Sequence, residues 1–301
     1  MENHPKITVV GSINMDLVTL TDKLPEMGET ITGKQFKMNP GGKGANQAVA
    51  AARLGAQVKM IGCVGRDSFG ENLLQHLQNE GIDASNVELV NDSTGTALIT
   101  VYNNDNNIIV VPGANNHVTA AFVETKRAVI ADSDILIVQL EIPLDSVQKA
   151  VEIAKENNVT VILNPAPITE LPAGLIEQID YFTPNEHEHS LLIKGMNEQQ
   201  IKEKVIVTKG SRGVSLYKGD EEITIPSFRV NAIDTTGAGD SFNGGLAVAL
   251  GKGLSLADAC KFGNAAAALS TLKIGAQTGM PGKEEVETMI KIAEKMKKHM
   301  K

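Results

Sequence analysis

Asp234-Thr-Thr-Gly-Ala-Gly-Asp240-Ser-Phe242 places three small residues immediately before an amphipathic run, Ser241–Leu250. The run predicts a helix, and the small side chains of Gly237, Ala238 and Gly239 allow backbone amides to approach a ligand closely. A helix N-terminus presents unpaired N–H groups and the positive end of the helix dipole, which together attract anions. The stretch therefore predicts an anion site at the start of a helix.

Asp240 puts a carboxylate beside the place that an anion would occupy, and two interpretations follow. Asp is a common N-cap, so Asp240 could simply begin the helix. Alternatively, Asp240 is a general base that removes the proton from a sugar hydroxyl as the hydroxyl attacks a γ-phosphate. The amides of residues 237–240 would then stabilise the charge on the transferred group. The stretch alone leaves both interpretations open.

Composition narrows the class of protein. The chain has 301 residues, of which 42% are hydrophobic, enough for one large α/β domain or two smaller ones. A net charge of −8 argues against a nucleic-acid partner, and no apolar run is long enough to predict a membrane span. Cys63 and Cys260 are predicted to be buried thiols in a reducing compartment. With a polar N-terminus that resembles no signal peptide, this indicates a cytoplasmic protein.

Strands and helices alternate along most of the chain, which predicts parallel βαβ units. The predicted strands include Ile7–Asn14, Val58–Val64, Ile135–Leu140 and Thr160–Leu163. The predicted helices include Gln47–Leu54, Ser68–Glu80, Ala120–Ala131, Leu144–Asn157, Ala257–Leu272 and a charged tail, Glu284–Lys301. We expect residues 1–301 to form one α/β domain, a doubly wound, mostly parallel sheet with helices on both faces.

Two segments do not follow this alternation of strands and helices. Leu17–Asn39 is short and turn-rich, and Thr94–Val111 contains an asparagine-rich link, Asn103–Asn107, between two apolar runs, which predicts a hairpin. We expect insertions at about residues 15–40 and 95–112 to pair into a small β-sheet lid that excludes water from a site. The alternative is that they are edge strands of the main sheet.

Polar residues follow the predicted strands at the edge where ligands collect in parallel sheets. Asn14, Asp16 and Glu141 are either turn and cap formers or ligands for the hydroxyls of a polyol. Pro40-Gly-Gly-Lys-Gly-Ala-Asn46 adds Gly42, which allows close backbone approach, and the donors Lys43 and Asn46. The spacing of a P-loop is absent from this glycine-rich turn.

The second half of the chain offers candidates for a nucleotide and cations. Asn185 and Glu188 share one face of an opening helical turn, where they could hold a hydrated Mg²⁺ at ATP phosphates. His187 and His189 are two residues apart, which favours solvated surface over a metal site. Thr208, Gly210 and Ser211 could line phosphates or ribose, and Asn264 could lie beside an adenine. Backbone carbonyls of Lys273–Gly279 could hold a cation.

Taken together, these motifs resemble the PfkB-type carbohydrate kinase family. The matching pieces are Gly11–Asp16, Pro40–Gln47, Asn185–Glu188, Asp234–Phe242 and Gly275-Ala-Gln277. They span nearly the whole chain in the family's order, and the two glycine motifs are specific in combination. The resemblance implies ATP-dependent phosphorylation of D-ribose at the 5-hydroxyl, with Mg²⁺ accompanying ATP, K⁺ as a monovalent activator, and a homodimer paired through the lid.

The resemblance also implies roles for individual residues. Asp240 matches the catalytic base, with Gly237, Ala238 and Gly239 as the anion hole. Sugar ligands would be Asn14, Asp16, Gly42, Lys43, Asn46, Glu141 and Asp240. Nucleotide contacts would be Asn185, Thr208, Lys209, Gly210, Ser211, Arg212, Gly213, Gly239, Asp240 and Asn264. Glu188 would act indirectly on Mg²⁺. The K⁺ site would comprise Asp234, Thr236, Ser270, Lys273, Gly275 and Gly279, although Gly279 lacks the side-chain oxygen that is often available there.

Two rival functions follow from the same residues. One is a family kinase acting on fructose, deoxyribose or a nucleoside; Asp16 as a partner for adjacent hydroxyls favours ribose over 2-deoxyribose. The other is a non-catalytic sugar or nucleotide sensor on the same fold. A carboxylate beside ATP weakens binding, so Asp240 favours catalysis over sensing.

Overall fold

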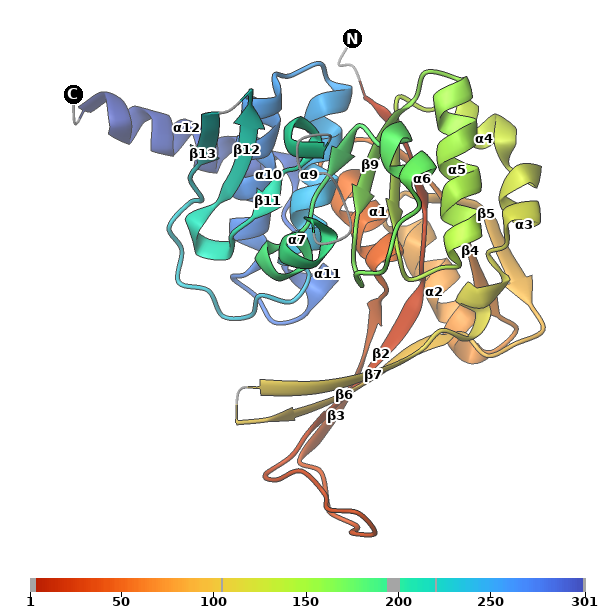
Figure 1. Cartoon of the computed structure of the whole chain (residues 1–301). Helices are drawn as coiled ribbons and strands as arrows, with labels where there is room; N and C mark the ends of the chain where they lie inside the picture. The colour runs from red at the N-terminus through yellow and green to blue at the C-terminus, as the bar shows by residue number, and fades with distance from the viewer. Residues whose placement is uncertain (1–3, 104, 194–200, 220, 300–301) are drawn as a thin grey trace.

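The computed structural model describes residues 4–103, 105–193, 201–219 and 221–299. Asn104, inside the predicted hairpin link, and Met300 and Lys301, at the end of the predicted tail helix, lie outside these residues. Figure 1 shows an α/β body from which a second sheet projects. Among the described helices, none is long and apolar enough to cross a membrane.

The central sheet is parallel and six-stranded, in the order β10-β9-β8-β1-β4-β5. From β1 the chain first adds strands on one side and then on the other, so the order reverses between β1 and β8. In such sheets ligands bind outside the carboxyl ends at this switch point. The strands are β1 Lys6–Val10, β4 Gln57–Gly65, β5 Asp83–Val90, β8 Ile135–Gln139, β9 Thr160–Asn164 and β10 Tyr181–Phe182.

Successive side chains of these strands point alternately into two hydrophobic cores, one on each face of the sheet. Ile135 and Ile137 of β8 belong to one core, and Leu136 and Val138 to the other. The first core packs under α1 Lys43–Arg53, α2 Ser68–Asn79, α9 Ala238–Gly251, α10 Leu256–Ser270 and α12 Lys283–His299. The second packs under α3 Ala120–Thr125, α4 Arg127–Ala131, α5 Leu144–Glu156, α6 Ala173–Gln178 and α7 Glu186–Leu192. The predicted fold class is confirmed.

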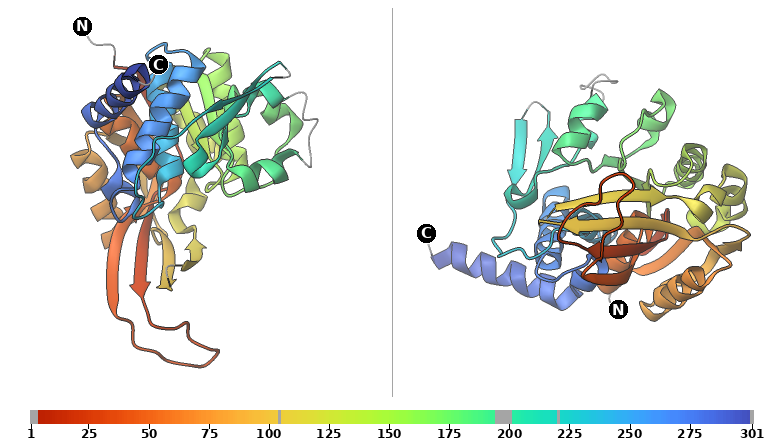
Figure 2. Two further views of the ribbon diagram at one scale, coloured as in Figure 1. Left: turned by 90° about the vertical axis from the view of Figure 1, so that its left-hand side faces the viewer. Right: turned by 90° about the horizontal axis from the view of Figure 1, so that it is seen from below.

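A separate four-stranded sheet, called here the projecting sheet, has the order β3-β2-β6-β7. Its strands are β2 Asn14–Leu20, β3 Gln35–Gly41, β6 Gly95–Tyr102 and β7 Asp105–Val111. The left view in Figure 2 shows it extending away from the body. The alternative of edge strands on the main sheet is therefore wrong. The central pair, β2 and β6, is parallel, and the outer pairs are antiparallel.

A third sheet, β11 Val207–Thr208, β12 Val214–Lys218 and β13 Glu221–Ile225, extends the body beside β10 through single bridges such as Asn185 to Thr208. Short helical turns η1 Gly113–His117, η3 Lys202–Lys204, η4 Gly210–Arg212 and α11 Ala276–Gly279 complete the described elements.

Several helices and strands begin or end at other residues than the sequence predicts. The first strand ends at Val10, because Asn14 already begins β2 of the projecting sheet. The predicted helix Ala120–Ala131 divides into α3 and α4 at Lys126. The two helices that follow glycine turns begin earlier than predicted, α1 at Lys43 and α9 at Ala238. Both start directly after a glycine with positive φ, Gly42 at 87° and Gly237 at 75°, which only glycine adopts without strain.

Candidate active site

Asp240 lies in the first turn of α9, two residues inside the helix. Gly237 occupies the N-cap and makes no side-chain cap bond, so the interpretation of Asp240 as the N-cap is wrong. The Ala238 N–H donates to the Thr235 carbonyl at 3.2 Å. A side chain added at Gly239 would meet nothing within 4 Å, so open space lies beside this helix N-terminus. The start of α9 thus has room for an anion.

The Asp240 carboxylate is buried, with only 8% of the residue exposed. Its two oxygens accept hydrogen bonds from two amides of α1: Asn46 Nδ2 donates to Oδ2 and Gln47 Nε2 to Oδ1, each at 2.9 Å. Burial raises the pKa of Asp240 above its ordinary value, although nearby Lys43 and these two bonds oppose the rise. The result is a fixed carboxylate that is more basic than an exposed aspartate, as a general base requires.

Asn14, Asp16, Lys43 and Glu141 gather at the switch point. Glu141 Oε2 accepts hydrogen bonds from Ser12 Oγ at 2.6 Å and from the Lys43 N–H at 3.1 Å. Asn14 Oδ1 accepts a bond of 2.7 Å from Asn115 Nδ2. Glu141 is thus held by Ser12, which follows β1, and by Lys43, which follows β3. Polar groups from separate segments of the chain therefore meet at the switch point.

The charged side chains of Asp16, Lys43 and Glu141 lie close enough to Asp240 and to one another to shift their pKa values. Burial raises the pKa of Asp16 to about 7, and the nearby carboxylates of Glu141 and Asp240 add to the rise. Burial lowers the pKa of Lys43, but the surrounding carboxylates, Asp240 and Glu141 foremost, bring it above its usual value. Lys43 therefore stays protonated among acidic groups. Asp16 lies against Gly41, where an added Cβ would come within 2.4 Å of its carboxylate oxygens.

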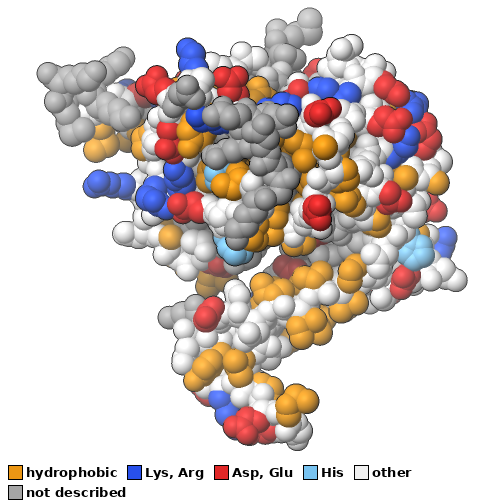
Figure 3. All heavy atoms as spheres, in the orientation of Figure 1, with side chains coloured by type: hydrophobic (Ala, Val, Ile, Leu, Met, Phe, Trp, Pro, Cys, Tyr) orange, Lys and Arg blue, Asp and Glu red, His pale blue; other side chains and the backbone are white. Residues whose placement is uncertain are grey.

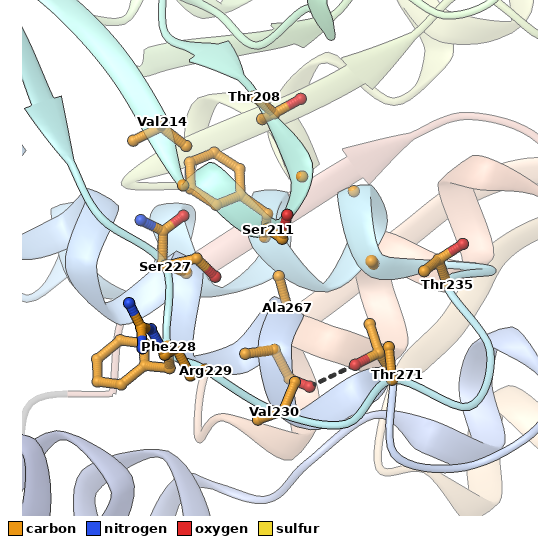
Figure 4. Close-up of a pocket in the computed structure, with 18 of the residues that line it drawn as sticks. Thr208, Ser211, Val214, Ser227, Phe228, Arg229, Val230, Thr235, Ala267 and Thr271 are labelled. Atoms are coloured by element: carbon orange, nitrogen blue, oxygen red, sulfur yellow. Dashed lines mark hydrogen bonds between the residues drawn. The ribbon is translucent and has the colours of Figure 1, made fainter.

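On the other side of the start of α9 lies a cavity of about 490 Å³, within the range of small-molecule sites. Figure 4 shows Thr208 and Ser211 on one wall, Ala267 of α10 and its C-cap Thr271 on another, and Thr235 at one end. Of the predicted nucleotide residues, the structure brings Thr208, Gly210, Ser211, Gly213, Gly239 and Asn264 to this cavity.

The side chains of three predicted nucleotide residues make contacts within the protein. The side chain of Lys209 pairs with Glu222 at 2.8 Å, and that of Arg212 with Glu186 at 2.5 Å. Asn264 Nδ2 donates to the carbonyl of Ile225 at 3.0 Å, so its amide supports the loop that follows β13. That loop supplies lining residues that the sequence interpretation missed: Ser227, Phe228, Val230 and Ala232.

Asn185 and Glu188 form a capping box at the start of α7. Asn185 Oδ1 accepts from the Glu188 N–H, and Glu188 Oε2 accepts from the Asn185 N–H, each at 2.8 Å. This reciprocal pair explains their spacing and leaves the second carboxylate oxygen of Glu188 available. Within the described residues, no cluster of three or more His, Cys, Asp or Glu side chains could hold a metal. His187 is exposed, in agreement with the surface interpretation.

The two segments predicted to hold K⁺ lie together. Asp234 Oδ2 accepts from the Gly275 N–H at 2.8 Å, and Asp234 Oδ1 accepts from Thr236 Oγ1 at 2.7 Å. These bonds lower the pKa of Asp234 although burial opposes the effect. A Cβ at Gly279 would lie 2.0 Å from the Ser270 carbonyl, so Gly279 approaches that carbonyl closely. The arrangement ties the loop of Asp234 and Thr236 to the start of α11 and brings Gly279 against the end of α10.

These features define an α/β protein with a buried carboxylate beside an open helix N-terminus, between a polar cluster and a cavity large enough for a small molecule. Comparison with known proteins agrees. The profile of the pfkB family of carbohydrate kinases matches residues 4–283. The chain belongs to this family of carbohydrate kinases.

Relatives with full-length matches narrow the class further. The chain is 44% identical to a ribokinase of Lactococcus lactis over 95% of this chain and 97% of the relative. It is 44% identical to a ribokinase of Bacillus subtilis over 94% and 99%, respectively. Among solved structures, it is similar to Arabidopsis thaliana ribokinase complexed with ribose and ATP, with a TM-score of 0.89 and 32% identity over 96% of this chain and 99% of the other.

Proposed function

We propose that this chain is an ATP-dependent sugar kinase that phosphorylates D-ribose at O5 and releases D-ribose 5-phosphate and ADP. One observation carries the proposal: the buried carboxylate of Asp240 lies in the first turn of α9, between the polar cluster of Asp16, Lys43 and Glu141 and the cavity lined by Gly239. The names of the relatives, ribokinases matched over nearly their whole length, support the same substrate.

In the proposed reaction, the polar cluster binds the sugar and presents its 5-hydroxyl to Asp240. The proposed sugar ligands are Asn14, Asp16, Gly42, Lys43, Asn46 and Glu141. The proton of the hydroxyl passes to Asp240 while O5 forms a bond to the γ-phosphorus and the bond from that phosphorus to the β–γ bridging oxygen breaks. ADP leaves with that oxygen.

The start of α9 supplies the proposed electrostatic contribution. We propose that the amides of Gly237, Ala238 and Gly239 contact the γ-phosphoryl group during transfer, because the N-terminal end of a helix favours negative charge. Because the Ala238 N–H bonds the Thr235 carbonyl here, we expect this bond to open when the phosphoryl group binds. The small residues matter because any larger side chain would fill the open space beside Gly239.

Two cations belong to the proposal. Mg²⁺ would accompany ATP and supply positive charge beside the phosphates, and Glu188 would hold a water ligand of the ion with the carboxylate oxygen that the capping box leaves available. K⁺ is proposed at the junction of Asp234 and Thr236 with the carbonyls of Ser270, Lys273, Gly275 and Gly279. When bound there, it would hold the loop of the anion hole against the loop that precedes α11.

We propose that the projecting sheet closes over the sugar and pairs with the same sheet of a second copy. Cross-strand register aligns Met38, Leu17, Leu98 and Ile109 on one face, and Asp16 on the opposite face. Three of the four apolar side chains are exposed by 44–64%, and Figure 3 shows apolar side chains gathered on this sheet. A continuous apolar row on a solvent-exposed sheet is typical of a protein interface.

The proposed compartment is the cytoplasm, where the buried, unpaired thiols of Cys63 and Cys260 stay reduced.

The test is ADP release with ATP and Mg²⁺ over a panel of D-ribose, 2-deoxyribose, fructose and nucleosides, each with K⁺ and again with Na⁺. We expect turnover on ribose, faster with K⁺. Preference for another sugar would retain the mechanism and overturn the substrate. Absence of turnover on every sugar, with ribose still bound in calorimetry, would place the protein among sensors.

A further inference from the structure

Two chains of side-chain amides hold the carboxylate of Asp240, one at each oxygen. At Oδ2 the donor is Asn46, whose own oxygen accepts from Gln277 Nε2 at 2.8 Å. Gln277 Oε1 in turn lies 2.6 Å from His76 Nε2. At Oδ1 the donor is Gln47, whose oxygen accepts from Gln139 Nε2 at 2.6 Å. These contacts extend well beyond the residues that reach a substrate.

The charge of Asp240 sets the direction of the first chain. A carboxylate only accepts hydrogen bonds, so Asn46 must turn its NH₂ group toward Asp240 and its oxygen toward Gln277. Gln277 must then turn its NH₂ group toward Asn46 and its oxygen toward His76. His76 must therefore carry a hydrogen on Nε2, which holds for the matching neutral tautomer and for the imidazolium. Every amide in the chain has one permitted orientation.

The chain is rigidly supported. Asn46 and Gln277 are buried, with 7% and 4% of each residue exposed, so neither amide can exchange its partner for bulk water. The backbone of Gln277 is held by Arg53, whose Nη1 donates to the carbonyls of Gln277 at 2.5 Å and Met280 at 3.0 Å. Glu80 fixes the Arg53 guanidinium through two further bonds of 2.6 and 2.8 Å. The short helix α11 therefore presents Gln277 from a fixed backbone.

We propose that Gln277 is a positioning residue for the catalytic base: through Asn46 it fixes the orientation of the Asp240 carboxylate, and His76 completes the chain. The inference rests on the proposed role of Asp240. Gln277 contacts Asn46, a proposed sugar ligand, and His76, but it does not line the nucleotide cavity. Its effect is therefore expected in kcat, with ATP affinity unchanged.

The decisive variant is Gln277→Met, which keeps an unbranched side chain of similar length and removes both hydrogen-bonding groups. Without Gln277, the Asn46 amide is held only by its own bond to Asp240, so its position is less fixed and its donation to Asp240 weakens. We expect kcat on ribose to fall roughly tenfold, the loss typical of one buried hydrogen bond. His76→Ala, at the partly exposed end of the chain, should lower kcat by roughly two- to threefold. Gln75→Met, the same substitution at an exposed residue beside His76, serves as the matched control.

A second readout does not depend on turnover. Donation by Asn46 favours the ionised carboxylate, so weakening it should raise the pKa of Asp240, measured by NMR on ¹³C-labelled aspartate, by roughly half to one pH unit. The charged groups that face Asp240 are Lys43 of α1, Glu141 after β8 and Asp16 of β2, and all remain in the variants. A merely structural role would lower the melting temperature and leave this pKa unchanged.

The activity of the variants and the pKa of Asp240 together distinguish failure of this inference from failure of the proposed function. In the background of Asn46→Ala, adding Gln277→Met should cost no further activity, because Gln277 acts through Asn46. Additive losses, or an unchanged Asp240 pKa in Gln277→Met, would overturn the inference while ribose turnover by the wild-type protein stands. If the wild-type protein phosphorylates no sugar, the proposed function fails, and the NMR titration alone decides the inference. If Gln277→Met does not fold, the same titration on His76→Ala decides it.

Discussion

Replacing Asp16 by asparagine should stabilise the ligand-free protein and abolish its affinity for ribose. Burial, with Glu141 and Asp240 nearby, raises the pKa of Asp16 from 3.8 to about 7. The folded protein therefore keeps a proton that the unfolded chain releases as pH rises from about 4 to about 7, and the free energy of unfolding falls across this window. Below pH 4 both states are protonated and this cost is absent.

The size of the effect follows from the same pKa. A rise from 3.8 to about 7 corresponds to roughly 4 kcal/mol above pH 7, at ~1.36 kcal/mol per pH unit. An asparagine side chain cannot ionise, so the variant avoids this cost. For a chain of 301 residues the unfolding entropy is about 0.6 kcal/mol/K, which converts the gain into an increase of about 7 °C in melting temperature.

The assay is thermal unfolding of the wild-type protein and Asp16→Asn at half-unit steps from pH 4.5 to 8.5, without sugar. We expect the two melting temperatures to converge at the acid end and to diverge up to pH 8. Asp22→Asn, at an exposed carboxylate near the end of β2, should stay close to wild type throughout. A difference that is independent of pH, or a variant that melts lower than wild type at pH 8, would refute the reasoning.

Three further predictions concern separate parts of the molecule. Asp240→Ala should lose roughly 10²–10⁴-fold in kcat while calorimetry still detects ribose binding, and full turnover would remove Asp240 from the role of base. Leu98→Lys should convert the proposed dimer into monomer in analytical ultracentrifugation, and an unchanged mass would place the interface elsewhere. Gly44→Ala should lower the melting temperature, because its Cβ would lie 2.6 Å from the Gly11 backbone. Gly174→Ala is its control, because an added Cβ at Gly174 would meet no atom within 4 Å.

The parallel sheet and its helices could be predicted because their signals are local. Alternating β-rich and amphipathic runs of ordinary length gave the strand and helix order, and the asparagine-rich link gave the hairpin of β6 and β7. The boundaries at glycine turns were less predictable. Gly42 and Gly237 adopt positive φ, which lets the chain turn sharply into a helix, so α1 and α9 begin three to four residues before the amphipathic pattern does.

The groups that support the site could not be predicted, because their partners are distant in sequence. Gln47 bonds Asp240, 193 residues away, and Asn115 bonds Asn14, 101 residues away. Neither Gln47 nor Asn115 differs in local pattern from an ordinary helical or loop amide. The sequence identifies residues that a motif makes specific, such as Asp240, and the packing of separate elements decides which amides hold them.

Close helix packing is what makes these long-range bonds possible. A Cβ at Gly244 of α9 would lie 2.6 Å from Ala50 Cβ of α1, so the two helices approach with almost no side chain between them. Short amide side chains such as Asn46 and Gln47 can span only this small separation to reach Asp240. The alanine-rich sequence of α1 and Gly244 of α9 therefore serve the base, since a larger residue at either place would move the carboxylate away from both of its donors. The requirement for small residues extends from the anion site into the helix–helix contact behind it.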